Sequence, residues 1–315
     1  MARSDLLVNL VKSGFRGERD LFRRTVEAII AEENAKQHHV LANELAKELH
    51  HDAGNGREAG RAPTSSTQSF VLEREAQRTL DSLVLADDTR AAVSQLVEEQ
   101  QRADLLRSFG LEPRHRVLLI GPPGNGKTSL AEACAGALCV PLLTVLYDAV
   151  IGSFLGETGV RVRRLFESVR RQQCVLFFDE FDTIAKERGD EHETGEIKRV
   201  VSSLLLEIDR LPSYVVVITA TNHPELLDRA VWRRFQLKLE LNSPNESQIL
   251  EWIRLFESRT GQKWIPKACL KDLRGRSYSE LEDFALDVAR RSLLSPERSH
   301  ERIIGEAVRS LARRL

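Results

Sequence analysis

Five short apolar runs, separated by helical patterns, dominate the middle of the chain. The runs are Val117–Ile120, Leu142–Val145, Val175–Phe178, Val215–Ala220 and Leu237–Leu241. Unbroken apolar runs of this length are typical of strands that are buried on both faces. Strands that alternate with helices predict an α/β fold with a doubly wound, mostly parallel sheet, and we expect residues 70–241 to form it.

The regions on either side of the predicted sheet show helical signals only. Residues 242–315 are expected to form a small C-terminal helical lid, and the spacing of Ser279 and Glu282 indicates a capping box at the start of one of its helices. Apolar stripes in residues 1–50 predict an N-terminal helical arm that is too small to build a core of its own. Residues 51–69, rich in Gly, Ser, Thr and Pro, are expected to be a flexible linker.

Composition narrows the function classes. The 315 residues include 42% hydrophobic positions, enough for a sizeable core. With 46 basic and 47 acidic residues, the net charge is −1, which argues against a protein that coats nucleic acid. A nucleic-acid motor stays open as a third reading because arginines are frequent near the C-terminus, but acidic residues interleave with them and favour an ordinary solvated helix face. The stretch carries Arg290, Arg291, Arg298, Arg302, Arg309, Arg313 and Arg314.

The expected cellular location depends on two signals, a secretory signal peptide and a membrane-spanning segment. The first residues show no apolar core of a secretory signal, and no run approaches the length of a membrane span. The four cysteines contain no Cys-x-x-Cys pair, so we expect buried reduced thiols. A cytoplasmic protein without a membrane partner is therefore expected.

A phosphate-binding loop follows the first apolar run. Its residues are Gly121, Pro122, Pro123, Gly124, Asn125, Gly126, Lys127 and Thr128, and a helical pattern comes next. This spacing, between a strand and a helix, lets glycine backbone wrap phosphate oxygens with its N–H groups. We expect Lys127 to reach the β and γ phosphates of ATP and the Thr128 hydroxyl to bind Mg²⁺.

Polar side chains end two further strands, at the edge where parallel sheets bind ligands. Asp179 and Glu180 follow the apolar run that ends at Phe178. Asp179 is expected to hold Mg²⁺ through water, and Glu180 to polarise the attacking water as a general base. Asn222 ends the next strand and is expected to hydrogen-bond the water or the γ-phosphate.

With these three motifs in order, the chain resembles the AAA family of ATPases over about residues 75 to 295. It looks most like single-ring members of the katanin, spastin and fidgetin group, and closer still to compact bacterial stand-alone members. The resemblance implies ATP and Mg²⁺ as cofactors and a homo-oligomeric ring, often a hexamer. Asn125 stands where Thr or Cys is common in the family.

Two segments carry what the resemblance implies about neighbouring subunits and clients. Ser153–Glu157 corresponds to the first pore loop, in which Phe154 would grip a polypeptide client. Leu227–Phe235 corresponds to the stretch that supplies arginine fingers, with Arg233, Arg234 or both as the finger.

The resemblance implies an ATP-driven protein remodeller or unfoldase that pulls polypeptide through a central pore. An alternative is a regulatory ATPase whose nucleotide state controls a separate effector held by the N-terminal arm. Some compact bacterial AAA proteins that the chain resembles are paired with a subtilisin-like serine protease, so the resemblance implies such a protease as one effector.

Overall fold

The computed structural model describes residues 25–26, 28, 70–150, 155–186 and 196–312. The chain divides into two units, Met1–Thr67 and Gln68–Leu315. In the first unit only Thr25, Val26 and Ala28 are described, all helical. The predicted arm and linker otherwise lie outside the described residues, and the second unit carries the fold.

A six-stranded sheet forms the centre of the second unit, in the order β1-β3-β4-β5-β2-β6. All neighbours pair in parallel except β1, which pairs antiparallel with β3 at one edge. The strands are β1 (Val71–Arg74), β2 (Arg116–Ile120), β3 (Leu142–Val145), β4 (Cys174–Phe178), β5 (Val215–Thr221) and β6 (Leu237–Glu240). The expectation of a mostly parallel α/β sheet is confirmed.

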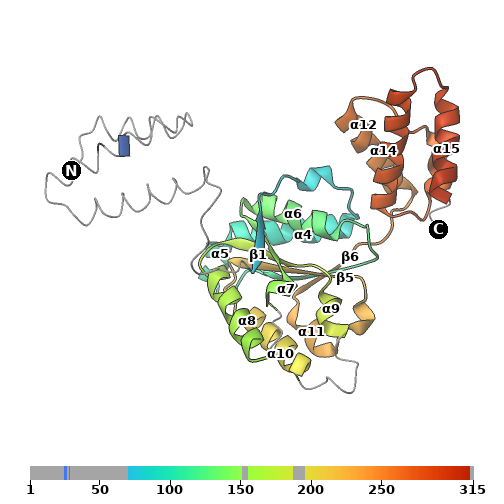
Figure 1. Cartoon of the computed structure of the whole chain (residues 1–315). Helices are drawn as coiled ribbons and strands as arrows, with labels where there is room; N and C mark the ends of the chain where they lie inside the picture. The colour runs from blue at the N-terminus through green and yellow to red at the C-terminus, as the bar shows by residue number, and fades with distance from the viewer. Residues whose placement is uncertain (1–24, 27, 29–69, 151–154, 187–195, 313–315) are drawn as a thin grey trace. The chain divides into compact units, whose positions relative to one another are not determined.

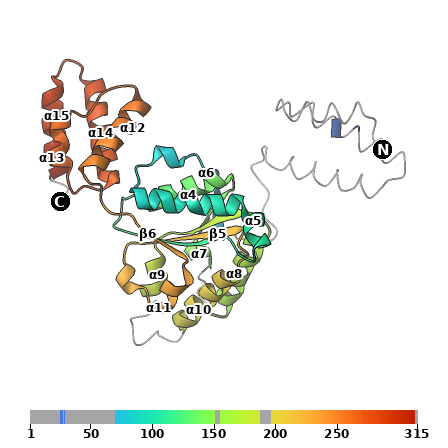
Figure 2. The same ribbon diagram turned by 180° about the vertical axis from the view of Figure 1, so that it is seen from behind.

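Helices cover both faces of this sheet (Figure 1, Figure 2). One face packs on α4 and α6 through a core that includes Leu96, Leu130 and Phe177. The other packs on α8 and α10, with α9 and α11 beside them, around Phe166, Phe178 and Phe235. The helices of this part are α4 (Asp87–Gln101), α5 (Ala103–Ser108), α6 (Lys127–Leu138), α7 (Tyr147–Val150), α8 (Leu155–Val169), α9 (Phe181–Lys186), α10 (Glu196–Asp209) and α11 (Arg229–Arg234).

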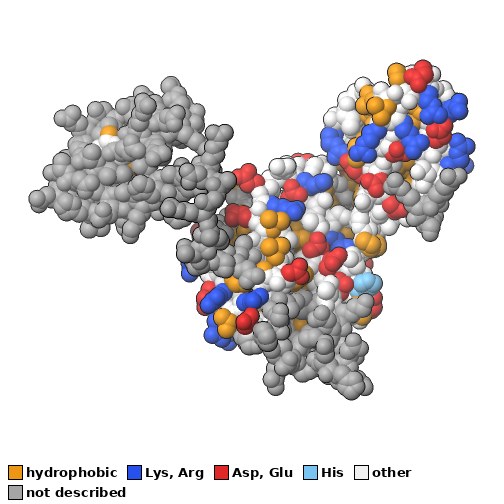
Figure 3. Space-filling model, viewed as in Figure 1, with side chains coloured by type: hydrophobic (Ala, Val, Ile, Leu, Met, Phe, Trp, Pro, Cys, Tyr) orange, Lys and Arg blue, Asp and Glu red, His pale blue; other side chains and the backbone are white. Residues whose placement is uncertain are grey.

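Four further helices, which we call the lid, follow β6 and bury a separate core around Phe256 and Phe284. They are α12 (Glu246–Thr260), α13 (Leu270–Leu273), α14 (Tyr278–Leu294) and α15 (His300–Ala312). Basic and acidic side chains interleave on the lid surface (Figure 3). Arg291, Arg298 and Arg302 each lie within ion-pair distance of Glu306.

Two further expectations concerned the state of the cysteines and the absence of a membrane-spanning segment. None of the four cysteines is in a disulfide, and three of them are buried, but Cys139, the residue after α6, is exposed. In the described ranges, no helix has the length and apolar character needed to cross a membrane.

Candidate nucleotide site

The loop between β2 and α6 is shaped by glycines that no other residue could replace. Gly121 has φ 151° and lies so close to the end of β6 that a Cβ would be 2.2 Å from the Leu241 carbonyl oxygen. Gly124 has φ 78°, and a Cβ there would lie 2.9 Å from the Ser277 Oγ of the lid. A positive φ favours glycine at both positions, and at Gly121 the neighbouring backbone leaves no room for a Cβ. The loop is therefore held between the sheet and the lid.

The Lys127 ammonium is buried in this loop with neutral partners. Its Nζ donates to the carbonyl oxygens of Gly121 at 2.6 Å and Pro122 at 3.0 Å, and to Asn222 Oδ1 at 2.6 Å. Burial lowers the pKa of Lys127, while the charges of Asp179 and Asp182 oppose that shift. Because none of these hydrogen-bond acceptors is charged, the ammonium is available for an anionic ligand.

Two carboxylates come together at the end of β4. The Thr128 hydroxyl, at the start of α6, donates to Asp179 Oδ2 at 3.0 Å. Glu180 follows with φ 47°, a strained conformation for a residue other than glycine, and its side chain is exposed in the cleft. Strain of this kind is concentrated at functional sites, where the surrounding structure holds it in place.

Asp182 is a site residue that our sequence reasoning missed. It is buried, and its Oδ1 accepts from the Thr221 hydroxyl at 2.8 Å and from the Asn222 main-chain N–H at 3.2 Å. The carboxylate therefore fixes the end of β5 and aims Asn222 at Lys127. A signal was present in the sequence, because a third acidic residue follows Asp179 and Glu180 within one helical turn.

Tyr147 is a second residue that the sequence did not suggest. Its hydroxyl donates to the main-chain carbonyl of Asp179 at 2.7 Å. Burial, reinforced by the nearby charges of Asp179, Asp182 and Glu180, raises the pKa of this phenol, so the hydroxyl stays a donor. The bond ties α7 to the end of β4.

A cleft of about 470 Å³ runs between these residues and the lid. Gly124, Lys127, Thr128, Asp179, Glu180 and Asn222 line one end, and Leu85, Trp252 and Tyr278 line the other. The lid contacts the loop directly, because the Ser279 N–H donates to the Gly124 carbonyl at 3.0 Å. The cleft thus joins the charged groups of the phosphate loop and strand ends to apolar and aromatic side chains, and Arg259 and Glu282 of the lid line it as well.

The predicted capping box is displaced by two residues. Ser277 and Glu280 form it at the start of α14, each side chain accepting from the other's backbone N–H. Ser279 therefore lies in the first helical turn, where N–H groups have no partner within the helix. That position frees its N–H for the carbonyl of Gly124.

The two candidate finger arginines lie at the end of α11 and do not line this cleft. Arg233 is exposed. Arg234 Nε donates to Asp209 Oδ2 at 2.8 Å, and Arg116 holds the other oxygen of Asp209 at 2.7 Å. Phe154, predicted to contact clients, lies outside the described residues.

The chemistry of the cleft fits a magnesium nucleotide. A loop of backbone N–H groups and a buried ammonium suit phosphates. The Thr128 hydroxyl lies 3.0 Å from Asp179 Oδ2, so the hydroxyl could bind Mg²⁺ directly while the carboxylate holds one of the waters that the ion keeps. Glu180 adds an exposed carboxylate beside them.

Comparisons with known proteins agree with this geometry. A family model described as "ATPase family associated with various cellular activities (AAA)" matches residues 117–243. The uncharacterised AAA family ATPase y4kL of Sinorhizobium fredii is 36% identical over 321 residues, covering 100% of this chain and 97% of the relative.

Longer proteins match over part of the chain. The peroxisomal ATPase pex6 of Schizosaccharomyces pombe is 43% identical over 153 residues, which cover 45% of this chain and 16% of the relative. The probable 26S proteasome regulatory subunit 10B of Caenorhabditis elegans is 37% identical over 163 residues, covering 50% and 40%. With a matched family model, a relative aligned over its whole length and a phosphate loop facing paired carboxylates, the chain belongs to the AAA family of ATPases and is an ATP hydrolase.

Proposed function

We propose that this ATPase works as a ring oligomer, a hexamer, which couples Mg²⁺-dependent ATP hydrolysis to the remodelling of protein clients. The observation that carries the proposal is the position of Arg233. It is exposed at the end of α11 and does not line the cleft of its own chain. An exposed cation next to a fixed structural element suits a contact with the site of a neighbouring subunit.

Within one cleft, the phosphate loop from Gly121 to Gly126 binds the phosphates through backbone N–H groups, and Lys127 supplies the balancing charge. Thr128 and Asp179 would hold Mg²⁺, which neutralises the charge that develops on the phosphates. Lys127 Nζ donates to Asn222 Oδ1 at 2.6 Å, so these two side chains would contact the same phosphate group.

Glu180 acts as the general base on the attacking water in this proposal. Its side chain faces the cleft, and its backbone is held in place because its own N–H donates to Asp179 Oδ1 at 3.0 Å. Asn222 orients the water or the γ-phosphate, with its backbone fixed by Asp182. A positioned base of this kind contributes about 10²–10⁴ in rate.

The two arginines divide the work at the subunit interface. Arg234 is held by Asp209, which Arg116 also contacts, and so fixes the end of α11 against the sheet. Arg233 projects from this fixed end and supplies the positive charge to the neighbour's transferring phosphate. A finger supplied in trans is worth roughly 10³–10⁵ in rate.

Remodelling of protein is favoured by the relatives. Two are named as a peroxisomal ATPase and a proteasome regulatory subunit, and AAA family members commonly form hexameric rings. We propose that Phe154 contacts the polypeptide client in the ring pore, and that residues 1–50 hold a protein effector such as a serine protease.

Mixing two inactive variants tests the shared site. Arg233→Ala keeps Glu180 but has no finger to offer, while Glu180→Gln offers a finger but cannot use one. Random mixing in equal amounts leaves about a quarter of the interfaces with both groups, so ATPase activity should reappear at about a quarter of the wild-type rate. The matched control mixes Glu180→Gln with a double variant that carries both changes. Activity absent from both mixtures would contradict the shared site.

A further inference from the structure

The apolar end of the cleft is built for a planar ring. Leu85 is buried on the sheet side, while Trp252 and Tyr278 face the cleft from the lid. Trp252 is itself stacked on Phe256, with ring centroids 5.5 Å apart. A nucleotide whose phosphates lie at Lys127 would extend its base toward this end, because aromatic and aliphatic walls favour a flat heterocycle.

Asn125 of the phosphate loop also lines the cleft and has an unused acceptor. The residue is 2% exposed, and its Nδ2 donates at 3.4 Å to both the Leu241 carbonyl and the Ser243 hydroxyl. Its Oδ1 is buried and has no hydrogen-bond partner in the described part of the chain. The Leu241 carbonyl can only accept a hydrogen bond, so the amide nitrogen must face it and the oxygen must face the other way.

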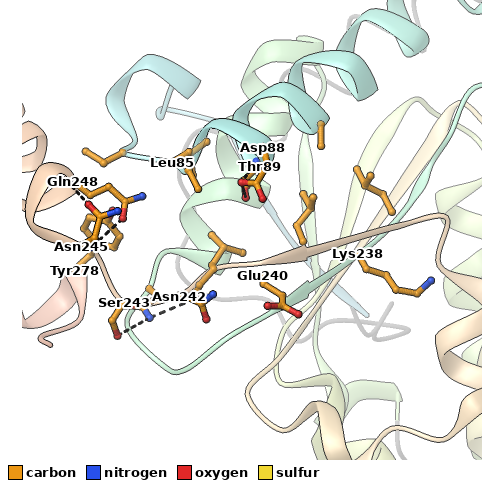
Figure 4. Close-up of a pocket in the computed structure, with 17 residues that line it drawn as sticks. Leu85, Asp88, Thr89, Lys238, Glu240, Asn242, Ser243, Asn245, Gln248 and Tyr278 are labelled. Carbon is orange, nitrogen blue, oxygen red and sulfur yellow. Dashed lines mark hydrogen bonds between the residues drawn. The ribbon is translucent and has the colours of Figure 1, made fainter.

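The hydroxyl of Tyr278 is a second buried polar atom without a partner among the described residues. Burial raises the pKa of Tyr278 to about 12, so its hydroxyl stays protonated at neutral pH. Figure 4 shows Tyr278 on the lid side of an adjoining cavity, together with Asn245 and Gln248 and with Leu85 across from them.

That adjoining cavity, of about 630 Å³, shares Asn125 and Tyr278 with the nucleotide cleft. The two residues therefore line both spaces. A buried carbonyl oxygen and a buried hydroxyl without partners cost free energy, roughly 1–3 kcal/mol each. A ligand that satisfied them would recover this cost, and a ligand that could not would be rejected.

We propose that Asn125 determines the choice of nucleotide base, its Oδ1 accepting a hydrogen bond from the 6-amino group of adenine, with the Tyr278 hydroxyl as a second contact to the base. This inference rests on the proposed binding of ATP in the cleft. Guanine places a carbonyl oxygen where adenine has the amine, so two acceptors would face each other. Asn125 thus accounts for selection among purines, a property that backbone contacts to phosphate cannot supply.

The test removes the amine from the ligand and the acceptor from the protein separately. The full chain carrying Glu180→Gln, so that triphosphates persist, is titrated calorimetrically with ATP and with purine riboside 5′-triphosphate, which has hydrogen in place of the 6-amino group. We expect ATP to bind about tenfold more tightly. When Asn125→Ala is added to this protein, the two ligands should bind within about twofold of each other. This holds even if the substitution changes the affinity for both ligands by the same factor.

Tyr278→Phe is the companion variant and should lower the ATP preference by a smaller factor. Inorganic tripolyphosphate is titrated into each variant to show that the loop still folds and binds phosphates. The inference is overturned if the Glu180→Gln protein, with Asn125 and Tyr278 intact, binds the two ligands equally. It is also overturned if Asn125→Ala keeps the full preference for ATP. Absence of ATP binding to the starting protein would instead contradict the proposed function.

Discussion

Asp182 and Asn222 are joined by a hydrogen bond from the Asn222 main-chain N–H to the buried Asp182 carboxylate, at 3.2 Å. The same oxygen accepts from Thr221. This arrangement sets the direction of a side chain that lines the nucleotide cleft, whereas Asp182 itself does not line it. Asp182 is therefore a positioning residue, and its removal should affect turnover more than binding.

Asp182→Ala should lower kcat by about 10–100-fold while ATP affinity changes by less than about threefold, because two bonds that orient Asn222 are lost. Asp182→Asn keeps a carbonyl oxygen in the same place and should restore most of the rate. Steady-state kinetics with separate kcat and KM values check both variants. A loss confined to KM, or an Asn variant as slow as the Ala variant, would contradict the positioning role.

Tyr147→Phe should destabilise the protein by about 1 kcal/mol, because the partly buried carbonyl of Asp179 loses its donor. Urea unfolding followed by tryptophan fluorescence measures this change. Tyr214→Phe is the matched control, since that hydroxyl bonds the Arg170 carbonyl on an exposed surface. Equal effects of the two substitutions would contradict a special role for the bond between α7 and β4.

As pH rises, nucleotide affinity should begin to fall at a lower pH than it would if Lys127 had the usual pKa of a lysine. Burial places the pKa of Lys127 below its usual 10.5, so the charge that binds phosphate is lost as pH rises through that lowered pKa. In the same window the unfolded chain binds more protons than the folded one, so the cost of burying the ammonium is relieved and stability rises with pH.

Binding of a fluorescent ATP analogue between pH 7 and pH 10.5 measures the effect. Lys127→Arg is the control, because a guanidinium stays protonated over this range. The wild-type affinity should decline while that of the variant stays flat. Parallel curves for the two proteins would contradict the assignment to Lys127.

The buried strands were predictable because strands covered on both faces consist almost entirely of apolar residues. Strand β1 was not, since most of its side chains are exposed and its pairing with β3 lies far away in sequence. The phosphate loop and the acidic pair could be predicted from their residue types and their positions after the apolar runs. The roles of Asp182, Tyr147 and Asn125 depend on partners 30 or more residues away, and a single sequence does not reveal such pairs.

The arginines illustrate the same limit. Arg233 and Arg234 are adjacent in the sequence, and the sequence alone did not indicate which of them would serve as the finger. In the structure only Arg234 is paired with Asp209, at the end of α10, 25 residues earlier in the chain. Packing is therefore the basis on which we propose Arg233, and not Arg234, as the finger.

Glu180 is proposed to be required for the hydrolysis of ATP but not for its binding in the cleft. The most direct measurement is single-turnover phosphate release by Glu180→Gln, with ATP binding followed in the same sample and Glu297→Gln, an exposed change on the lid, as the control. The amide cannot accept a proton from water, so release should slow by at least about 100-fold while ATP stays bound. Phosphate release at the wild-type rate by Glu180→Gln would contradict the account.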